Sequence, residues 1–187
     1  MQIVGLLATS VALAVIPPAV PANLQVENAK AFLIAHASGT QNYICLPSAT
    51  GVAWTLFGPQ ATLFDEDQRQ IITHFLSANP GENGTLRPTW QHSRDTSAVW
   101  AAAVETSSDS AYVAPGAIPW LKLRVMGAQA GPADGDKLAS ASYIQRVNTA
   151  GGAAPATGCA SSTDIGRRAL VPYAADYVFY RNRSESE

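Results

Sequence analysis

The chain is a succession of short β-forming segments separated by turn signals, and this pattern constrains its fold more than any other feature. Apolar side chains alternate with polar ones most clearly in 118–126 and 171–180. Many short strands joined by Gly, Pro, Asn and Asp turns are typical of antiparallel sandwiches and barrels. We predict strands at Gln41–Cys45, Val52–Phe57, Ala61–Phe64, Arg69–Phe75, Pro88–His92, Ser97–Val104, Ile118–Met126, Tyr143–Val147 and Val171–Tyr180.

One segment near the start of the domain has a different period. In Val26–His36 the apolar residues Val26, Ala29, Phe32 and Leu33 recur at helical spacing, which predicts one short N-terminal helix, with a strand as the alternative. Stretches rich in Gly, Ser, Ala and Pro at 127–141 and 149–165 predict long loops. The fold class expected is therefore mostly β, a single-domain antiparallel β-sandwich or barrel with long loops and one short helix.

The N-terminal segment has the composition of a cleavable secretory signal. Met1–Ala22 carries no charged side chain and ends in the small-residue stretch Ala19-Val20-Pro21-Ala22. Its apolar run is shorter than the roughly 20 residues that span a bilayer, and Pro17-Pro18 argues against a buried helix. We expect 1–22 to be a signal peptide and 23–187 to be one secreted domain, extracellular or in the cell wall.

Composition narrows the class of partner. The formal net charge is −2, and charged residues make up 14% of the chain, against about 25% in ordinary globular domains. No basic block occurs, so no nucleic-acid partner is expected. No second hydrophobic run follows the signal, so no membrane partner is expected after cleavage. Two Asn-x-Ser/Thr sequons make Asn83 and Asn182 glycosylation candidates.

The two cysteines of the chain, Cys45 and Cys159, are expected to form a disulfide. An oxidising compartment makes that pairing the default outcome. The alternative is a catalytic or metal-binding thiol. Neither residue lies in a Cys-x-x-Cys motif or a Cys/His cluster, which weighs against that alternative.

Long motifs in the chain resemble a known family. They comprise Gly39-x-Gln41-x-Tyr43-x-Cys45, Ile118-Pro119-Trp120-Leu121, a run from Ile144 through Gly151-Gly152 to Gly158-Cys159, and Val171-Pro172-Tyr173-x-Ala175-Asp176-Tyr177. This set is similar to the family known as domain of unknown function 3455, found in secreted fungal and bacterial proteins. The resemblance covers Pro21 to Arg181 and implies a secreted single domain in which Cys45 pairs with Cys159. It implies no reaction.

The chain departs from the family at one turn. Asp95-Thr96-Ser97 stands where Asp-Gly-Ser is usual, and the missing glycine argues against a tight turn there.

Fungal members of that family are often labelled malate dehydrogenase, and the residues argue against such an activity. A dinucleotide site needs Gly-x-Gly-x-x-Gly between a strand and a helix. The glycines of 151–158 have another spacing, Pro155 interrupts any helix, and no βαβ alternation surrounds them. No Gly-x-Ser-x-Gly, His-Glu-x-x-His or EF-hand motif occurs either. We expect no organic cofactor.

Histidines supply the remaining candidates for chemistry. His74 and His92 fall in neighbouring predicted strands, which could bring their imidazoles together with Asp95 as a third ligand of a transition metal or as a tautomer-fixing partner. The alternative for each is a histidine that only packs or hydrogen-bonds. Trp90 is a ligand candidate if its ring is exposed for stacking, and a core residue otherwise. His36, on the predicted helix, is expected to be a surface residue or a residue of the helix C-terminus.

These observations favour a secreted, non-catalytic binding or interaction module. Aromatic and uncharged polar side chains in a cleft between long loops would capture an extracellular ligand: a cell-wall carbohydrate, a host protein or a small molecule. The alternative is a metal-assisted extracellular enzyme that uses His74, His92 and Asp95.

Overall fold

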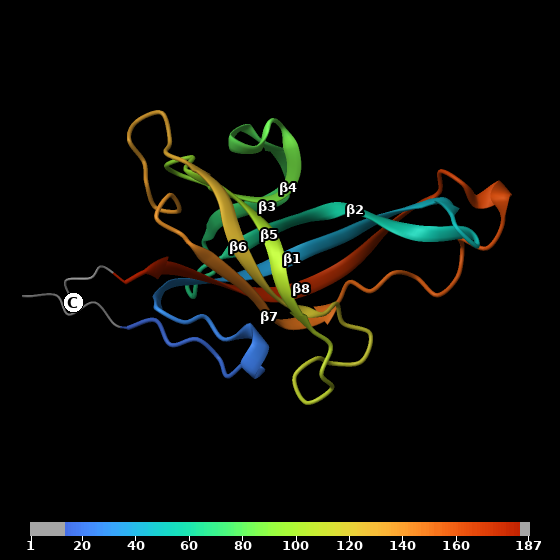
Figure 1. Ribbon diagram of the computed structural model, residues 1–187, viewed down its shortest axis with the longest axis horizontal. Coiled ribbons are helices and arrows are strands. Elements are labelled where there is room, and N and C mark those ends of the chain that lie inside the picture. Colours follow the sequence, from blue (N-terminus) through green and yellow to red (C-terminus); the bar gives the residue numbers. More distant parts are fainter. Residues whose placement is uncertain (1–13, 184–187) are drawn as a thin grey trace, which may run out of the picture.

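The computed structural model describes residues 14–183, which form a closed barrel of eight antiparallel strands (Figure 1). The strands follow one another around the barrel in chain order, and the last pairs with the first. They are β1 (Ala29–Ser48), β2 (Gly51–Phe64), β3 (Gln70–Asn79), β4 (Thr85–His92), β5 (Ala98–Ser107), β6 (Trp120–Gln129), β7 (Tyr143–Gly151) and β8 (Arg168–Asn182). Three short 3-10 turns, η1 (Ala22–Leu24), η2 (Pro80–Glu82) and η3 (Ser162–Asp164), are the helical elements of this part of the chain.

The barrel confirms the mostly-β prediction, and the predicted N-terminal helix is wrong. β1 starts at Ala29 and occupies most of the segment assigned to that helix. A bulge between Ala31 and Leu33 in the pairing with β8 inserts Phe32 as an extra residue. Phe32 and Leu33 consequently both pack against the core. Because the two adjacent apolar residues of the bulge both pack against the core, their spacing in the sequence resembles that of a helical face.

A second correction concerns β2. The segments 52–57 and 61–64, predicted as two strands, are one continuous strand with Gly58-Pro59 in its middle. A register shift in β1–β2 pairing occurs beside Gly58, because Asn42 pairs with Gly58 and Tyr43 pairs with Leu56. The glycine therefore marks a bulge rather than a turn.

Side chains that point into the lumen fill one half of the barrel. Alternate residues of the strands form an apolar cluster that includes Leu63, Ile72, Val99, Ile144 and Phe179, all fully buried. The loop between β6 and β7 folds over this half and inserts Leu138, which is also fully buried. We call this the closed end of the barrel.

The N-terminal segment packs on the outside of the barrel. Leu24 is fully buried in a second cluster with Trp120, Val147 and Val178 on the outer faces of β6, β7 and β8. Gln145 fixes the segment, since its Nε2 donates to the Leu24 carbonyl at 2.6 Å. Within 14–183, no helix has the length and apolar character needed to cross a bilayer.

The predicted signal peptide lies mostly outside the described residues, because 1–13 are not among them. In the remainder of that segment, Val15 and Val20 pack against the outer cluster. Cleavage after Ala22 stays a prediction. Asn83 and Asn182 are both exposed, and their glycosylation likewise stays a prediction.

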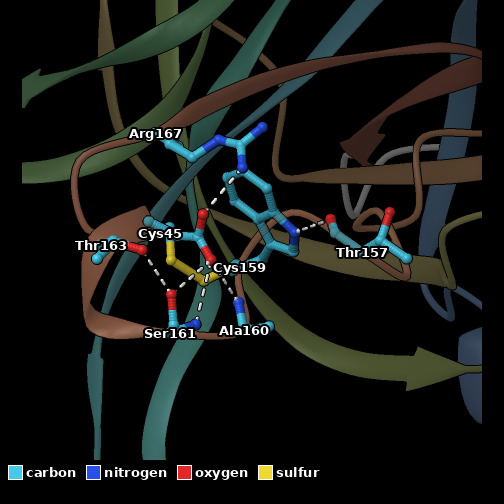
Figure 2. Close-up of a disulfide and its surroundings, with 9 residues drawn as sticks. Cys45, Thr157, Cys159, Ala160, Ser161, Thr163 and Arg167 are labelled. Atoms are coloured by element: carbon cyan, nitrogen blue, oxygen red, sulfur yellow. Dashed lines mark hydrogen bonds and ion pairs between the residues drawn. A yellow bond between two sulfur atoms is a disulfide. The ribbon is translucent and has the colours of Figure 1, made fainter.

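The end of the barrel opposite the closed end carries an arm, formed where β1, β2 and β8 extend together (Figure 1). Here the disulfide joins Cys45 of β1 to Cys159 in the β7–β8 loop, as expected (Figure 2). The loop is also tied to β2, because Trp54 Nε1 donates to the Thr157 carbonyl at 3.0 Å. The Cys45 carbonyl accepts from the Gly166 amide at 2.9 Å.

The turn between β4 and β5 corrects the expectation drawn from the missing glycine. It is tight, since the His92 carbonyl accepts from the Thr96 amide at 3.0 Å and the His92 amide donates to the Ser97 carbonyl at 2.9 Å. Thr96 achieves it with a φ of 56°, in the left-handed region that β-branched residues rarely adopt. The turn is therefore strained rather than absent.

Replacing Thr96 by glycine should relieve that strain. We expect T96G to raise the free energy of unfolding by up to about 1 kcal/mol. Glycine removes the energetic penalty of the left-handed conformation, and part of that gain is offset because glycine also gives the unfolded chain more conformational freedom. Urea denaturation of T96G and T96A measures the effect, and alanine is the control because it keeps a Cβ. Equal stability of the two variants would contradict the strain account.

The disulfide closes a loop of 114 residues, and its loss should destabilise the protein by about 2–5 kcal/mol. We expect C45A, C159A and the double variant to show equal losses, because each removes the same bond. Denaturation of all three beside the reduced wild type makes the measurement. A double variant much less stable than either single variant would contradict a simple loss of one bond.

Candidate functional site

The half of the lumen away from the closed end holds a cavity. Its volume is about 240 Å³, and every one of the eight strands contributes to its wall. The cavity is therefore the lumen itself rather than a groove between two surface elements. The wall residues are Gln41, Leu56, Pro59, His74, Pro88, Trp90, Ala103, Leu121, Leu123, Arg146 and Tyr177.

Three aromatic rings form the most deeply buried part of this wall. His74 and Trp90 are paired across β3 and β4, and their rings stack with centroids 4.2 Å apart. The Tyr177 ring meets both edge-on, 5.1 Å from His74 and 5.5 Å from Trp90. This packing fixes the orientation of all three rings and offers a ligand a rigid aromatic wall.

His74 is a neutral group in this environment. Burial lowers its pKa to about 3, although a hydrogen bond from Nδ1 to the Thr89 carbonyl at 2.8 Å acts in the opposite direction. With its proton on Nδ1, the ring keeps Nε2 as an acceptor. His74 therefore contributes shape and one acceptor to the cavity, and no charge near neutral pH.

Two polar groups of the wall are buried without partners. Gln41 is 2% exposed and Trp90 is 1% exposed, and neither Gln41 Nε2 nor Trp90 Nε1 makes a hydrogen bond. Among the described residues, Trp120 Nε1 in the outer cluster is the one other buried side-chain nitrogen or oxygen of this kind. An unsatisfied buried donor costs about 1–3 kcal/mol, so both groups lower the stability of the free protein.

Arg146 is the one charged residue of the wall. Its Nε and Nη2 both donate to the Pro119 carbonyl, at 3.3 and 2.8 Å. Within residues 14–183 no carboxylate forms an ion pair with it. The positive charge of Arg146 acts on Tyr177, another residue of the wall: burial raises the pKa of the Tyr177 hydroxyl, and Arg146 opposes that rise.

The start of the β7–β8 loop packs closely against β1 beside Gln41. The Gly152 carbonyl accepts from the Tyr43 hydroxyl at 2.7 Å, which holds the start of the β7–β8 loop against β1. The approach is close, since a Cβ on Gly152 would lie 2.9 Å from Tyr173 Cβ and 3.2 Å from Gln41 Cγ. Its φ of 83° also favours glycine.

The exposed part of the wall is apolar and marks the mouth of the cavity. Leu56 is 52% exposed, Ala103 is exposed, and Pro59, Pro88 and Leu121 are half-buried. These residues come from β2, β4, β5 and β6. A ligand that enters between these strands meets apolar side chains first and the polar groups of the wall deeper inside.

His92 and Asp95 lie at the closed end rather than in this cavity wall. His92 Nδ1 is 3.0 Å from Asp95 Oδ1. The Asp95 carboxylate also accepts from the Ser97 hydroxyl at 2.8 Å and from the Lys137 amide at 2.9 Å. Burial opposes its ionisation, yet the hydrogen bonds from Lys137 and Ser97 hold the pKa of Asp95 below its ordinary value. The Asp95 carboxylate thus holds in place the β6–β7 loop, which carries Leu138.

The proposed metal ligands are therefore only partly brought together. His92 and Asp95 are neighbours, whereas His74 Nδ1 is bonded to the Thr89 carbonyl. Across residues 14–183, no group of three or more His, Cys, Asp or Glu side chains is placed to hold a metal ion. The metal-assisted alternative gains no support from this geometry. Trp90, the fourth candidate, belongs to the cavity wall, and its ring is buried.

His36 is half-buried in β1 rather than on the expected helix, and it belongs to a charged cluster that the sequence did not indicate. It pairs with Asp176 across β1 and β8, with Nδ1 2.7 Å from Asp176 Oδ1, and Nε2 is 3.2 Å from Glu66 Oε1. The hydrogen bond to Asp176 raises the pKa of His36. Asn148 Nδ2 holds the other Asp176 oxygen at 2.7 Å.

Gln41, Arg146 and Tyr177 were not predicted as site residues. The sequence signal available for them was the period-two alternation of a strand, because each lies two residues from a buried apolar or aromatic position on its strand. Alternation alone places them on the inner face and does not indicate where the lumen is left unfilled.

The family comparison agrees with the resemblance drawn from the motifs. Residues 26–181 match the family described as "Protein of unknown function (DUF3455)", and the chain belongs to that family. No curated protein and no solved structure matches the chain.

The opposite pKa shifts of His74 and His36 predict opposite pH dependences of stability. A histidine with a lowered folded pKa contributes stability that is present above about pH 6.5 and is lost as the pH falls. We expect the stability difference between wild type and H74F to shrink by up to about 1.4 kcal/mol per pH unit below that point. Denaturant unfolding across the acidic range measures it.

The H36Q variant is the control, because the contribution of His36 to stability should depend on pH in the opposite direction. The folded pKa of His36 is raised, so its contribution is present at low pH and is lost as the pH rises through that value. Titration of the histidine Cε1 protons by NMR should show His74 still neutral near pH 5 and His36 titrating above its ordinary value of about 6.5. A normal midpoint for His74 would show that its ring is accessible to water.

Proposed function

We propose that this family member is a secreted, non-catalytic binding protein that holds a small molecule in the lumen of its barrel. The observation that carries the proposal is the cavity of about 240 Å³ walled by all eight strands, with two buried N–H donors that lack acceptors. Secretion is supported by the composition of Met1–Ala22 and by the Cys45–Cys159 disulfide.

The size and shape of the cavity favour a small molecule over a carbohydrate chain or a host protein. Its volume of about 240 Å³ is below the range of about 300–1,000 Å³ typical of sites for drug-sized ligands. The Trp90 ring is buried rather than presented as a flat sugar-stacking platform. The ligand expected is compact, with an apolar part that fits the apolar mouth.

Larger hollows exist on the outer surface but are weaker candidates. Those of about 650, 510 and 480 Å³ are grooves bordered by parts of 14–28, and all three include residues of the predicted signal. In the first, the Lys122 ammonium already donates to the Asn23 carbonyl at 2.8 Å. None of the three is bordered by Gln41 or Trp90.

The chemistry of the wall favours binding over catalysis. Its eleven residues include no Ser, Cys, Asp or Glu. The histidine is neutral with a very low pKa and has no carboxylate to orient it, unlike a general base poised near the working pH. These residues can orient and enclose a ligand, and they offer no nucleophile–base pair.

A bulky residue at the mouth should abolish binding. Ala103 lines the cavity, whereas exposed Val104 borders a different groove. We expect A103W to lose at least tenfold in affinity for trans-cinnamamide, a compact neutral aromatic probe, and V104W to bind it like wild type. Calorimetry and the indole N–H resonance of Trp90 report binding. Equal binding by A103W and V104W would contradict a site in the lumen.

A further inference from the structure

The cavity has an unbalanced charge. Arg146 is the one ionised side chain among the eleven wall residues, and no acidic residue faces it across the wall. A guanidinium carries five N–H donors, and in the described chain it makes two hydrogen bonds, both to the Pro119 carbonyl. A partly buried cation without a counter-ion is unfavourable unless a ligand or solvent supplies one.

The other unsatisfied groups of the wall are donors as well. Gln41 Nε2 and Trp90 Nε1 both lack acceptors. Both Gln41 and Arg146 lie near the Tyr173 hydroxyl. Burial raises the pKa of Tyr173, and the charge of Arg146 and the Gln41 amide beside the hydroxyl oppose that rise. The wall is therefore positive and rich in N–H groups, and His74 Nε2 is its available ring acceptor.

Resting on the proposed lumenal binding, we propose that the ligand is a small apolar carboxylate, its carboxylate bound by Arg146 and the Gln41 and Trp90 N–H groups. A carboxylate suits a single guanidinium, because one cation balances its one negative charge and the two groups form parallel hydrogen bonds. A doubly charged phosphate would keep an excess negative charge in a small, largely apolar space. The apolar body of the ligand lies toward Leu56, Pro88 and Leu121 at the mouth.

A ligand-binding role accounts for the polar side chain of Gln41 on a face where an apolar residue would pack without an unsatisfied donor. A buried amide without a partner lowers the stability of the free protein. If the amide exists to bind ligand, its removal makes the free protein more stable and the complex weaker. A residue with a purely structural role behaves in the opposite way.

The test compares trans-cinnamate with trans-cinnamamide, its neutral isostere, by calorimetry. Wild-type protein is expected to bind cinnamate at least tenfold more tightly than cinnamamide. R146Q, which removes the charge, is expected to lose that preference. Cinnamate binding that is unchanged in folded R146Q overturns the inference.

A second variant replaces Gln41. It is needed because R146Q removes the hydrogen bond to the Pro119 carbonyl as well as the charge. We expect Q41M to raise the Tm of the free protein and to weaken cinnamate binding at least tenfold. Q145M is the matched control, because buried Gln145 lies on the outer face with both amide ends partnered, by the Leu24 carbonyl and the Tyr180 hydroxyl. It should lower the Tm and leave cinnamate affinity unchanged.

The outcomes separate the two proposals. Cinnamamide binding that A103W blocks, without a preference for cinnamate, overturns the carboxylate inference and leaves lumenal binding intact. Cinnamate affinity unchanged in Q41M also overturns the inference, whether or not R146Q folds. Failure of both probes to bind wild-type protein overturns the proposed site together with the inference.

Discussion

The pairing of β8 with β1 is the constraint on which the rest of this structure depends. It closes the sheet, removes both exposed edges and fixes which side chains of every strand face the lumen. An eight-stranded barrel is just wide enough for side chains to fill or for one small ligand to occupy. Whether such a barrel is a solid core or a binding protein therefore depends on a few inward-facing residues.

In this chain the two halves of the lumen differ in that respect. At the closed end, buried apolar residues and Leu138 form the core, and Asp95 holds the loop that carries Leu138. In the other half, stacked His74 and Trp90 make a rigid wall, and Gln41 and Arg146 stand where apolar side chains would complete the core. Groups that weaken the free protein gather in the half that is left unfilled, as is common at functional sites.

Alternation and turn signals predicted the β class, the approximate strands and the single domain-sized barrel-or-sandwich fold, because period-two patterning is a local property. The helix at Val26–His36 was a wrong prediction because a bulge at Phe32 is decided by pairing with β8, more than a hundred residues away. The cavity escaped prediction for the same reason: eight strands contribute to it, so no window of sequence contains it. His74 and Trp90 were found as candidates, while His92 and Asp95 proved to secure a turn and a loop.

The central claim is that the unfilled half of the lumen is a site for a small carboxylate. A crystal structure of the mature protein grown with trans-cinnamate tests it most directly. The account predicts the carboxylate of the ligand against the Arg146 guanidinium and the Gln41 and Trp90 N–H groups, with its ring toward Leu56, Pro88 and Leu121 at the mouth. Ordered waters alone on Gln41 and Trp90, or cinnamate bound only in an outer groove beside residues 14–28, would contradict it.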